Sequence, residues 1–254
     1  MIKFFRKIRQ KLLAENKLSK YLLYAIGEIL LIVIGLFIAI QLNNINLDKA
    51  VYNKQLQHLK YIKAEMTNNL AVMNEKLELS LEILKAERKI VNHKSNTLTE
   101  KDFSELLRTI TFNELIVPFE NGVLNEIISS GGLKDIRNDR IRNILASWEG
   151  KKTDLISQEL QLAEVRNAII NFYSREGSIR TILDIDTYLK NLDIQRSNDL
   201  FSNLKLLKSR TFENAIIHHM LLTWYLGYSI YPKLENDINE LIRLIDIELS
   251  IQKK

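Results

Sequence analysis

The residue run from Tyr21 to Leu42 constrains this chain more than any other feature. It reads YLLYAIGEILLIVIGLFIAIQL, and Glu28 is its only charged side chain. A helix needs about 20 mostly apolar residues to cross the hydrocarbon core of a bilayer. The run therefore predicts one membrane-spanning helix over residues 21–42, and it makes the lipid bilayer the first expected partner.

The charges on either side of this run predict its orientation. Residues 1–20 hold seven Lys or Arg against Glu15 alone, whereas the first charges after the run are Asp48 and Lys49. Lys and Arg are enriched at the cytoplasmic ends of membrane helices. We therefore expect a basic cytoplasmic segment at residues 1–20 and an extracytoplasmic body at residues 43–254, periplasmic in a chain held in the inner (cytoplasmic) membrane.

A cleaved signal peptide is the competing interpretation of the same pattern. The basic region and the apolar run are both too long for one, and FIAIQLNN contains no small-x-small cleavage site. The chain has no cysteine, which excludes a lipoprotein anchor, thiol catalysis and thiolate metal sites. An uncleaved signal anchor is the expected form.

The charge balance of the body argues against nucleic acid as a partner. The chain has 36 Lys and Arg and 31 Asp and Glu. Seven of the bases and Glu15 precede the run and Glu28 lies within it, so residues 43–254 carry 29 charges of each sign. The positive excess belongs to the anchor, where it favours an anionic lipid leaflet.

The composition predicts an all-α protein. Only two prolines and eight glycines interrupt the 254 residues. After the run, apolar residues recur at steps of three and four in a stripe that predicts one helix to about Val91: Leu59, Ile62, Met66, Leu70, Met73, Leu77, Leu81 and Leu84. The expected fold is a single N-terminal transmembrane helix followed by an elongated antiparallel helical bundle with long, coiled-coil-like helices.

Further helices are expected along the body. Thr99 or Ser95 can cap a helix over 102–110, and Pro118 fits the first turn of another that ends near Ser130 and the following Gly131-Gly132 pair. Asn138 or Asp139 can cap a long helix ending near Gly177. Residues 178–199 are irregular, and Ser197 or Asn198 can cap a segment to Lys208. A last helix is expected from Thr211 to Ile251, kinked at Pro232.

The membrane run offers two features that could carry function. Gly27, Gly35 and Ala39 fall on one stripe, which is either a helix-packing face or a set of small residues facing lipid. Glu28 is an acid at membrane depth, and such residues often serve ion movement or subunit contacts. Glu28 also lies about one turn from the interfacial Lys20 and tyrosines, so it could instead reach the interface.

No catalytic, metal-binding or cofactor-binding signature is found in the body. The four histidines have no H-E-x-x-H spacing, and no serine has a G-x-S-x-G context. Adjacent residues on a helix point about 100° apart, so His218 and His219 are not expected to share one metal. We expect these histidines in solvent or at the edge of the core, no enzyme activity and no cofactor.

Aromatic residues in the last helix suggest a different kind of site. Trp224, Tyr225, Tyr228 and Tyr231 lie close together in the sequence, and Trp148 belongs to the preceding long helix. They are either core residues of the bundle or the lining of a groove for a ligand or partner. The groove interpretation rests on Trp148, Trp224, Tyr228 and Tyr231.

The N-terminal segment KFFRKIRQKLLAENKLSKYLLYAIGEILLIVIGLFIAIQLNN resembles a family of uncharacterised single-pass membrane proteins of Bacteroidota, a domain of unknown function. The segment GVLNEIISSGGLKDIRNDRIRNILASW is similar to a helix, Ser-Gly turn and second helix of that family, although Trp148-Glu149 stands where paired tyrosines are expected. The resemblance implies an inner-membrane location and a helical body. It supplies no activity.

Three functions remain open on the sequence alone. The first is a membrane-anchored interaction or scaffold protein, either a homo-oligomer or an accessory subunit of a bacterial envelope complex. The second is an ion-coupled or stator-like subunit that uses Glu28. The third is an extracytoplasmic ligand-binding sensor that acts through a partner.

Overall fold

The computed structural model describes residues 18–94, 98–184, 188–198 and 201–251. Every regular element in these ranges is a helix and none is a β-strand, which confirms the all-α prediction. The predicted basic segment lies outside the described residues except for its last three positions. The described chain divides into two units, one up to Gln55 and one from Leu56 onward.

The unit up to Gln55 is the first part of helix α2, which runs unbroken from Leu18 to Val91. This part is long and apolar enough to cross a membrane, and none of its most apolar 18-residue window is buried. Leu31 and Phe37 are 65% and 64% exposed, and the apolar residues around them are similarly open. A helix that is apolar on all sides needs cover from lipid or from protein.

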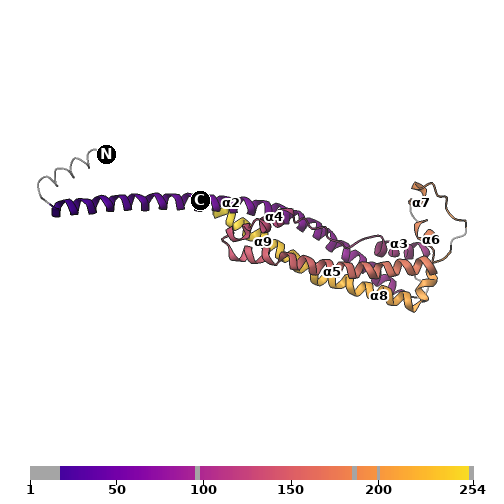
Figure 1. Ribbon diagram of the computed structural model, residues 1–254. Helices are drawn as coiled ribbons and strands as arrows, with labels where there is room; N and C mark the ends of the chain where they lie inside the picture. The colour runs from indigo at the N-terminus through magenta and orange to yellow at the C-terminus, as the bar shows by residue number, and fades with distance from the viewer. Residues whose placement is uncertain (1–17, 95–97, 185–187, 199–200, 252–254) are drawn as a thin grey trace. The chain divides into compact units, whose positions relative to one another are not determined.

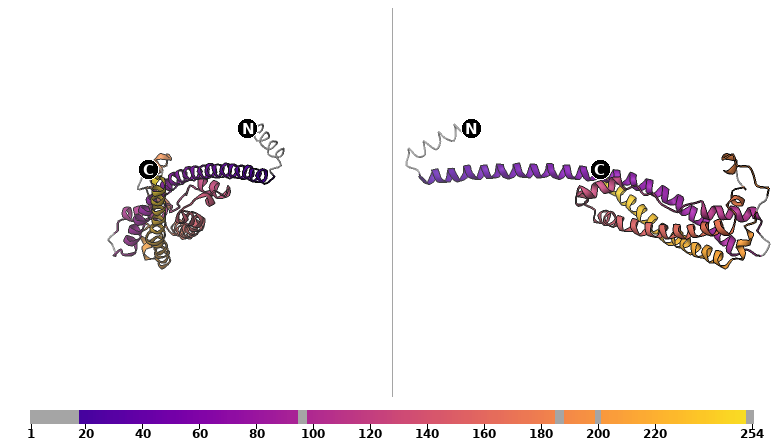
Figure 2. Two further views of the ribbon diagram at one scale, coloured as in Figure 1. Left: turned by 90° about the vertical axis from the view of Figure 1, so that its left-hand side faces the viewer. Right: turned by 45° about the vertical axis from the view of Figure 1, so that its right-hand side comes forward.

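The body from Leu56 onward is built on three long helical rods, shown in Figures 1 and 2. The first rod is the remainder of α2 and the second is α5, Asp139–Glu176. The third joins α8, Arg210–Tyr225, through the π-helical turn η3, Leu226–Ile230, to α9, Tyr231–Ile251. The three rods share one apolar core.

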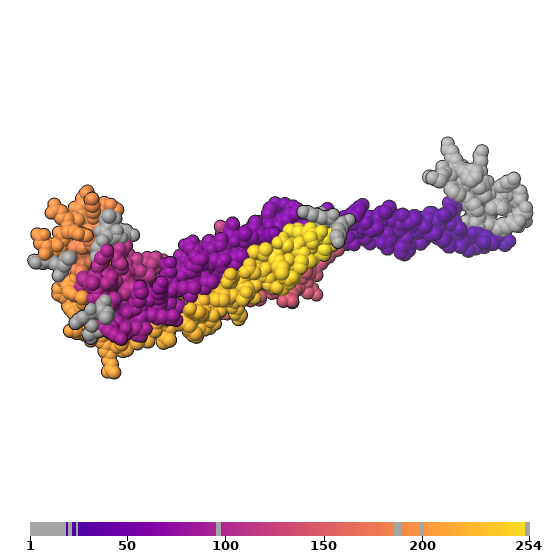
Figure 3. Space-filling view, turned by 180° about the vertical axis from the view of Figure 1, so that it is seen from behind, coloured from indigo at the N-terminus to yellow at the C-terminus, as the bar shows by residue number. Residues whose placement is uncertain are grey.

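Side-chain pairs fix the directions of the rods. On α2, Lys63 bonds Asp246 of α9 at 2.5 Å, and Glu87 bonds His219 of α8. The third rod is therefore antiparallel to α2, and Figure 3 shows the yellow α9 lying along the purple part of α2. The third rod is also antiparallel to α5, as two further pairs show: Lys151 with Asp237 and Glu159 with Tyr231.

The predicted apolar stripe on α2 faces this core for most of its length. Leu59, Ile62, Met66 and Met73 are completely buried. Leu81 is the exception, because it is 40% exposed although it keeps the spacing of the stripe. The stripe contributes to a core that includes Leu155 and Ile169 of α5 and, from the third rod, Phe212, Ile238 and Ile245.

Helix α3, Glu100–Thr111, begins at Thr99 as predicted. The Thr99 hydroxyl accepts from the Asp102 N–H at 3.1 Å, and the Asp102 carboxylate accepts from the Thr99 N–H at 3.0 Å. This reciprocal pair is a capping box. The alternative cap, Ser95, lies outside the described residues.

The prediction that Pro118 opens a helix is wrong. Residues 113–121 form neither helix nor strand, and α4 begins only at Gly122 and ends at Ser129. Side chains of the rods bind several N–H groups here and at the start of α4, whereas the Phe119 N–H donates to the Val117 carbonyl at 2.9 Å. Asn69 binds both the N–H and the carbonyl of Glu120 at 2.8 Å, and Glu65 accepts from the N–H groups of Val123 and Leu124. Tertiary hydrogen bonds therefore override the local helix signal.

The predicted turn after α4 is present. Gly131 has a φ of +70°, which favours glycine, and it precedes the 3₁₀ helix η1, Gly132–Asp135. Asn138 then caps α5 by accepting from the N–H groups of Arg140 and Ile141. The helix is continuous through Gly150. It ends before Gly177, as expected.

The region after α5 holds two short helices, α6, Ile179–Leu183, and α7, Tyr188–Asn191. The predicted caps Ser197 and Asn198 do not start the next element, because the 3₁₀ helix η2 begins later and spans Leu204–Lys208. Buried Asn203 binds this region to the end of α5. Its amide accepts from the Ser178 N–H at 2.7 Å and donates to the Ser178 carbonyl at 3.0 Å.

The last rod is interrupted before Pro232 rather than at it. The π turn η3 ends at Ile230, so Pro232 lies in the first turn of α9, where its missing N–H is tolerated. Gly227 in this turn lies so close to α2 that a Cβ there would be 2.5 Å from the Ser80 hydroxyl oxygen. The missing side chain lets the two rods approach each other.

Candidate functional site

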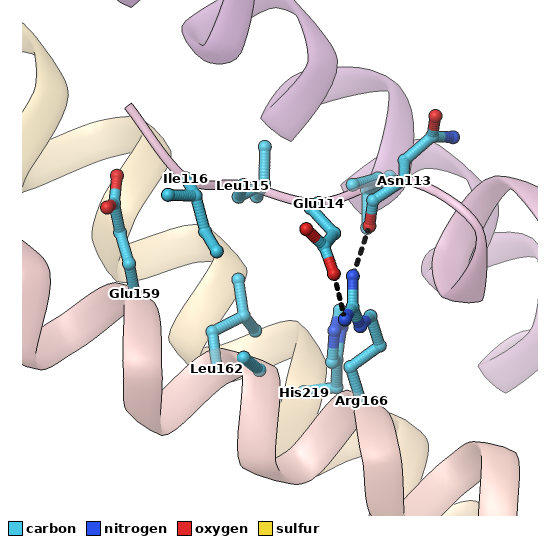
Figure 4. Close-up of a pocket in the computed structure, with 10 residues that line it drawn as sticks. Asn113, Glu114, Leu115, Ile116, Glu159, Leu162, Arg166 and His219 are labelled. Atoms are coloured by element: carbon cyan, nitrogen blue, oxygen red, sulfur yellow. Dashed lines mark hydrogen bonds and ion pairs between the residues drawn. The ribbon is translucent and has the colours of Figure 1, made fainter. Parts of the chain in front are cut away.

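Several ionisable side chains lie together in one buried polar cluster between the three rods. The cluster consists of Glu87 on α2, Glu159 and Arg166 on α5, His219 on α8 and Tyr231 on α9. Each of these residues holds a position that its helix turns toward the core. Figure 4 shows Glu159, Arg166 and His219 of this cluster, with the segment that starts at Asn113 passing alongside.

Glu87 and His219 form the most deeply buried pair of the cluster. Their exposed fractions are 0% and 1%, and a Glu87 carboxyl oxygen lies within hydrogen-bond distance of His219 Nδ1. The Thr223 hydroxyl donates to the His219 carbonyl at 2.9 Å. These contacts join α2 to α8 across the core.

Both members of this pair are neutral at pH 7. Burial raises the pKa of Glu87 to about 9, against a smaller lowering by a hydrogen bond from Thr223. Burial also lowers the pKa of His219 to about 3, helped by the positive charge of Arg166. The protonated Glu87 carboxyl therefore donates to Nδ1 of a neutral imidazole.

Glu159 is the second buried acid. Its Oε1 accepts from the Val117 N–H and from the Tyr231 hydroxyl, both at 3.1 Å. Burial raises the pKa of Glu159 to about 7, although these two hydrogen bonds and Lys76 oppose the rise. Burial and the neighbouring Glu159 carboxylate raise the pKa of Tyr231, so its hydroxyl stays protonated and acts as a donor.

Arg166 binds segment 113–121 to the cluster. Its guanidinium donates to the Glu114 carboxylate at 2.6 Å and to the Asn113 carbonyl at 3.2 Å, and Figure 4 shows both contacts. The side chain of Arg166 is only 13% exposed. Arg166 holds the segment next to the cavity and lowers the pKa of Glu114 by hydrogen bonding and charge.

The cavity enclosed by these residues is small. Its volume is about 10 Å³, and its lining includes Glu159, Arg166, His219 and residues 113–116. That is the space for about one water molecule. Within the cluster, three buried polar atoms have no hydrogen-bond partner among the described residues: Glu87 Oε2, Glu159 Oε2 and Arg166 Nε. A substrate or an organic cofactor does not fit here, so the cluster is suited to holding segment 113–121 in place.

The described residues contain no group of three or more His, Cys, Asp or Glu side chains arranged to hold a metal ion. His218 does not join His219 in the cluster. The expectation that His219 lies in solvent or at the core edge is wrong, because this residue is fully buried against Glu87.

The aromatic residues singled out in the sequence separate into two environments. Trp148 is 1% exposed, donates its indole N–H to Asn121 at 3.1 Å and packs edge-on against Phe119. Tyr231 is fully buried in the polar cluster. Trp224 and Tyr228 lie on the surface instead, 49% and 54% exposed, with their rings stacked at a centroid distance of 6.2 Å. The four residues therefore do not line one groove.

The candidate residues of the apolar run all lie on the first part of α2. Ala39 is exposed and Glu28 is half-buried. A Cβ at Gly27 or Gly35 would meet no atom within 4 Å. The stripe of small residues is thus open on the chain itself, which is the condition for a second helix to pack there.

The buried acids were missed from the sequence, although a signal was present. Glu87 occupies the next step of the α2 stripe, three residues after Leu84. Glu159 follows the core residue Leu155 by four positions, and His219 follows Ile216 by three. A charged or polar side chain that keeps an apolar register is a candidate for a buried polar contact.

No family model, curated protein or solved structure matches this chain.

Proposed function

We propose that this protein is a membrane-anchored helical interaction protein that acts as a scaffold or an accessory subunit of a bacterial envelope complex. The observation that carries the proposal is the exposed apolar surface of α2 between Leu22 and Leu47. In water this surface would be strongly unfavourable, whereas a bilayer covers it completely. Residues 21–42 would span the inner membrane, with the basic N-terminal segment in the cytoplasm and the body in the periplasm.

The body supports an interaction role better than a catalytic one. Its buried acids and histidine lie around a cavity of about 10 Å³ and bind groups of the same chain, because Glu87 binds His219 and Glu159 accepts from the Val117 N–H. The long rods present extended outer surfaces, which suit contacts with other proteins. The resemblance to single-pass membrane proteins of Bacteroidota stays a prediction that agrees with this proposal.

Membrane insertion can be tested with a matched pair of variants. In Ile34→Lys/Ile38→Lys, two exposed apolar residues of the run become charged, and each lysine near the centre of a bilayer costs about 2.5–3.5 kcal/mol on insertion scales. In Ile156→Lys/Leu160→Lys, the same change with the same spacing falls on exposed positions of the body. We expect the native chain and the body variant to remain in alkali-washed membranes and the run variant to be lost from them.

Two outcomes would contradict the proposal. Release of the native chain by alkali would remove the membrane anchor. Protease protection of the body in intact spheroplasts, from which the outer membrane has been removed, would place it in the cytoplasm. For the interaction role, purification of the full chain in mild detergent should give a stoichiometric envelope partner or a defined homo-oligomer, and a lone monomer would overturn it.

A further inference from the structure

An exposed surface lies where the third rod meets the end of α2, and we call it the aromatic–basic surface. On one side it consists of Leu221, Trp224, Tyr225 and Tyr228 of α8 and η3, which are 41–57% exposed. On the other side it consists of Leu81, Lys85, Arg88 and Lys89 of α2. The two sides are adjacent because Gly227 lies against Ser80.

The apolar side of this surface is continuous. Leu221, Trp224 and Tyr228 follow one another at steps of three and four, so they form a ridge along the rod. Trp224 and Tyr228 stack with an angle of 26° between their rings. Single exposed apolar residues are ordinary, but a contiguous ridge of a leucine, a tryptophan and a tyrosine, with exposed Tyr225 beside it, has the composition of an interaction site.

The π turn marks where the exposed ridge ends and the rod turns its aromatic residues into the core. Tyr228 lies inside η3 and points outward, while Tyr231, which begins α9, is completely buried. π turns within α-helices are rare and are frequent at functional sites. Here the turn brings Gly227 against α2 and leaves Tyr228 at the edge of a hollow.

That hollow is open and basic. Its volume is about 630 Å³, and its lining includes Tyr228, Leu81 and Leu84 together with Lys85, Arg88 and Lys89. No acidic residue is part of the lining. The last turn of α2 favours Arg88 and Lys89 through the helix dipole. The dipole does not account for Lys85, one turn earlier, or for the aromatic ridge beside it.

We propose that the aromatic–basic surface binds an acidic amphipathic helix of a partner protein. Carboxylates of that helix would face Lys85, Arg88 and Lys89, and its apolar side chains would pack on Leu221, Trp224 and Tyr228. The shape supports a helix, because the open hollow follows the last turns of α2 and the residues just after them, from Leu81 to His93, with Tyr228 of the antiparallel third rod at its edge, and such a trough accepts a helix lengthwise. The charge supports an acidic one, since the three bases form no ion pair with the described part of the chain. This proposal rests on the proposed interaction role and names the partner class.

Site-specific photo-cross-linking tests the proposal on the full chain in its native membrane. Benzoylphenylalanine replaces Tyr228 in one variant and Leu160, a 56% exposed residue of α5, in the control. We expect an adduct only at position 228, and the cross-linked peptide should be acidic with apolar residues at helical spacing. An adduct with lipid, with a second copy of this chain or with a basic segment would overturn the proposal, as would no adduct.

Charge reversal provides the second arm. Lys85→Glu/Arg88→Glu should reduce the yield of the adduct about tenfold, because attraction becomes repulsion at two contacts. The control Lys60→Glu/Lys134→Glu changes two exposed lysines elsewhere and should leave the yield unchanged. An undiminished yield in the first variant would contradict the basic contact. If position 228 gives no adduct while the detergent-purified chain still brings a stoichiometric partner, the surface is wrong and the proposed function stands.

Discussion

Glu87 of α2 and His219 of α8 hydrogen bond across the core of the body with neither residue exposed. The two residues lie on rods that run in opposite directions, so this contact fixes how far one rod is shifted along the other. Burial keeps the carboxyl protonated and the imidazole neutral. The pair thus gives a polar registration point to an otherwise apolar interface.

A neutral pair predicts an unequal response to two substitutions. Glu87→Gln should lower the free energy of unfolding by less than about 1 kcal/mol, because the amide still donates to Nδ1. His219→Ala should lower it by about 2–4 kcal/mol, because it leaves a cavity and an unpaired buried carboxyl. Denaturant unfolding of the full chain in detergent, followed by far-UV circular dichroism, measures both. A loss for Glu87→Gln as large as for His219→Ala would show that the native pair is ionic.

The same pair predicts that stability falls as the solution becomes alkaline. Glu87 is protonated in the folded chain up to about pH 9 but only up to about pH 4.5 when unfolded, so the folded state holds the extra proton between these values. Stability conferred in this way is lost as pH rises through that window, by at most about 1.4 kcal/mol per pH unit.

Two other groups affect how the stability of the body depends on pH. Glu159 acts in the same direction up to about pH 7, whereas His219 opposes both between about pH 3 and 6.5. Between pH 7 and 9 Glu87 is the only one of the three whose protonation still differs between the folded and unfolded chain, so the decline expected there belongs to Glu87, and Glu87→Gln should flatten it. A thermal midpoint that is constant from pH 7 to 9 in the native chain would rule out the buried neutral acid.

The sequence predicted the rods well because their signals are local and repeated. The stripe from Leu59 to Leu84, the Thr99 and Asn138 caps and the Gly177 stop all depend on residues within a few positions of one another. The non-helical segment around Pro118 was missed because its hydrogen bonds go to Asn69, Glu65 and other residues far away in the chain. A local helix-start signal carries no information about such partners.

Gly227 and Ser80 give a test of the close approach between α2 and the π turn. Gly227→Ala should destabilise the body by about 1–3 kcal/mol, because the new methyl group would be 2.5 Å from the Ser80 hydroxyl oxygen. Adding Ser80→Ala removes that oxygen and leaves a tolerable 3.4 Å contact with Cβ, so most of the loss should be restored.

Gly150→Ala is the matched control for this pair. It places the same methyl group in a helix where no atom lies within 4 Å, so stability should rise by about 0.5–1 kcal/mol. If Gly227→Ala behaves like Gly150→Ala, the approach of the two rods is looser than the structure has it.

The candidate site was only partly accessible to sequence reasoning. Tyr231 was singled out, but its partner Glu159 was not, since nothing in a single sequence tells which acid on an apolar face meets which hydroxyl. Trp148 and Trp224 look alike in the sequence, yet one is in the core and the other is on the surface. The π turn lies between Trp224 and Tyr231, and it changes the helical period there, so a helix drawn with uniform period does not predict that Tyr231 is buried while Trp224 is exposed.

The small residues of the apolar run predict a specific effect on self-association. Gly35→Leu adds a large side chain at a position where the chain itself has open space, so the fold of the body should be unaffected. If two copies pack along Gly27, Gly35 and Ala39, the change should abolish cross-linked dimers in the membrane, because bulky residues keep the helix backbones apart. Phe37→Leu, on another face, is the control. Equal dimer yields in both variants would show that Gly27, Gly35 and Ala39 face lipid and form no helix-packing face.

Glu28→Gln separates an interaction protein from an ion-coupled one. The amide keeps the size and hydrogen-bonding capacity of the side chain but cannot carry or release a proton. Glu28 is half-buried and lies near the interfacial end of the run, where an acid costs far less than at the bilayer centre. For an interaction protein we expect normal amounts in the membrane, an unchanged yield of partner or oligomer, and normal function of the complex. Normal assembly combined with loss of the partner's ion-dependent activity would contradict this expectation. Such a complex would have kept its contacts and lost only a titratable group, so Glu28 would be assigned to ion movement.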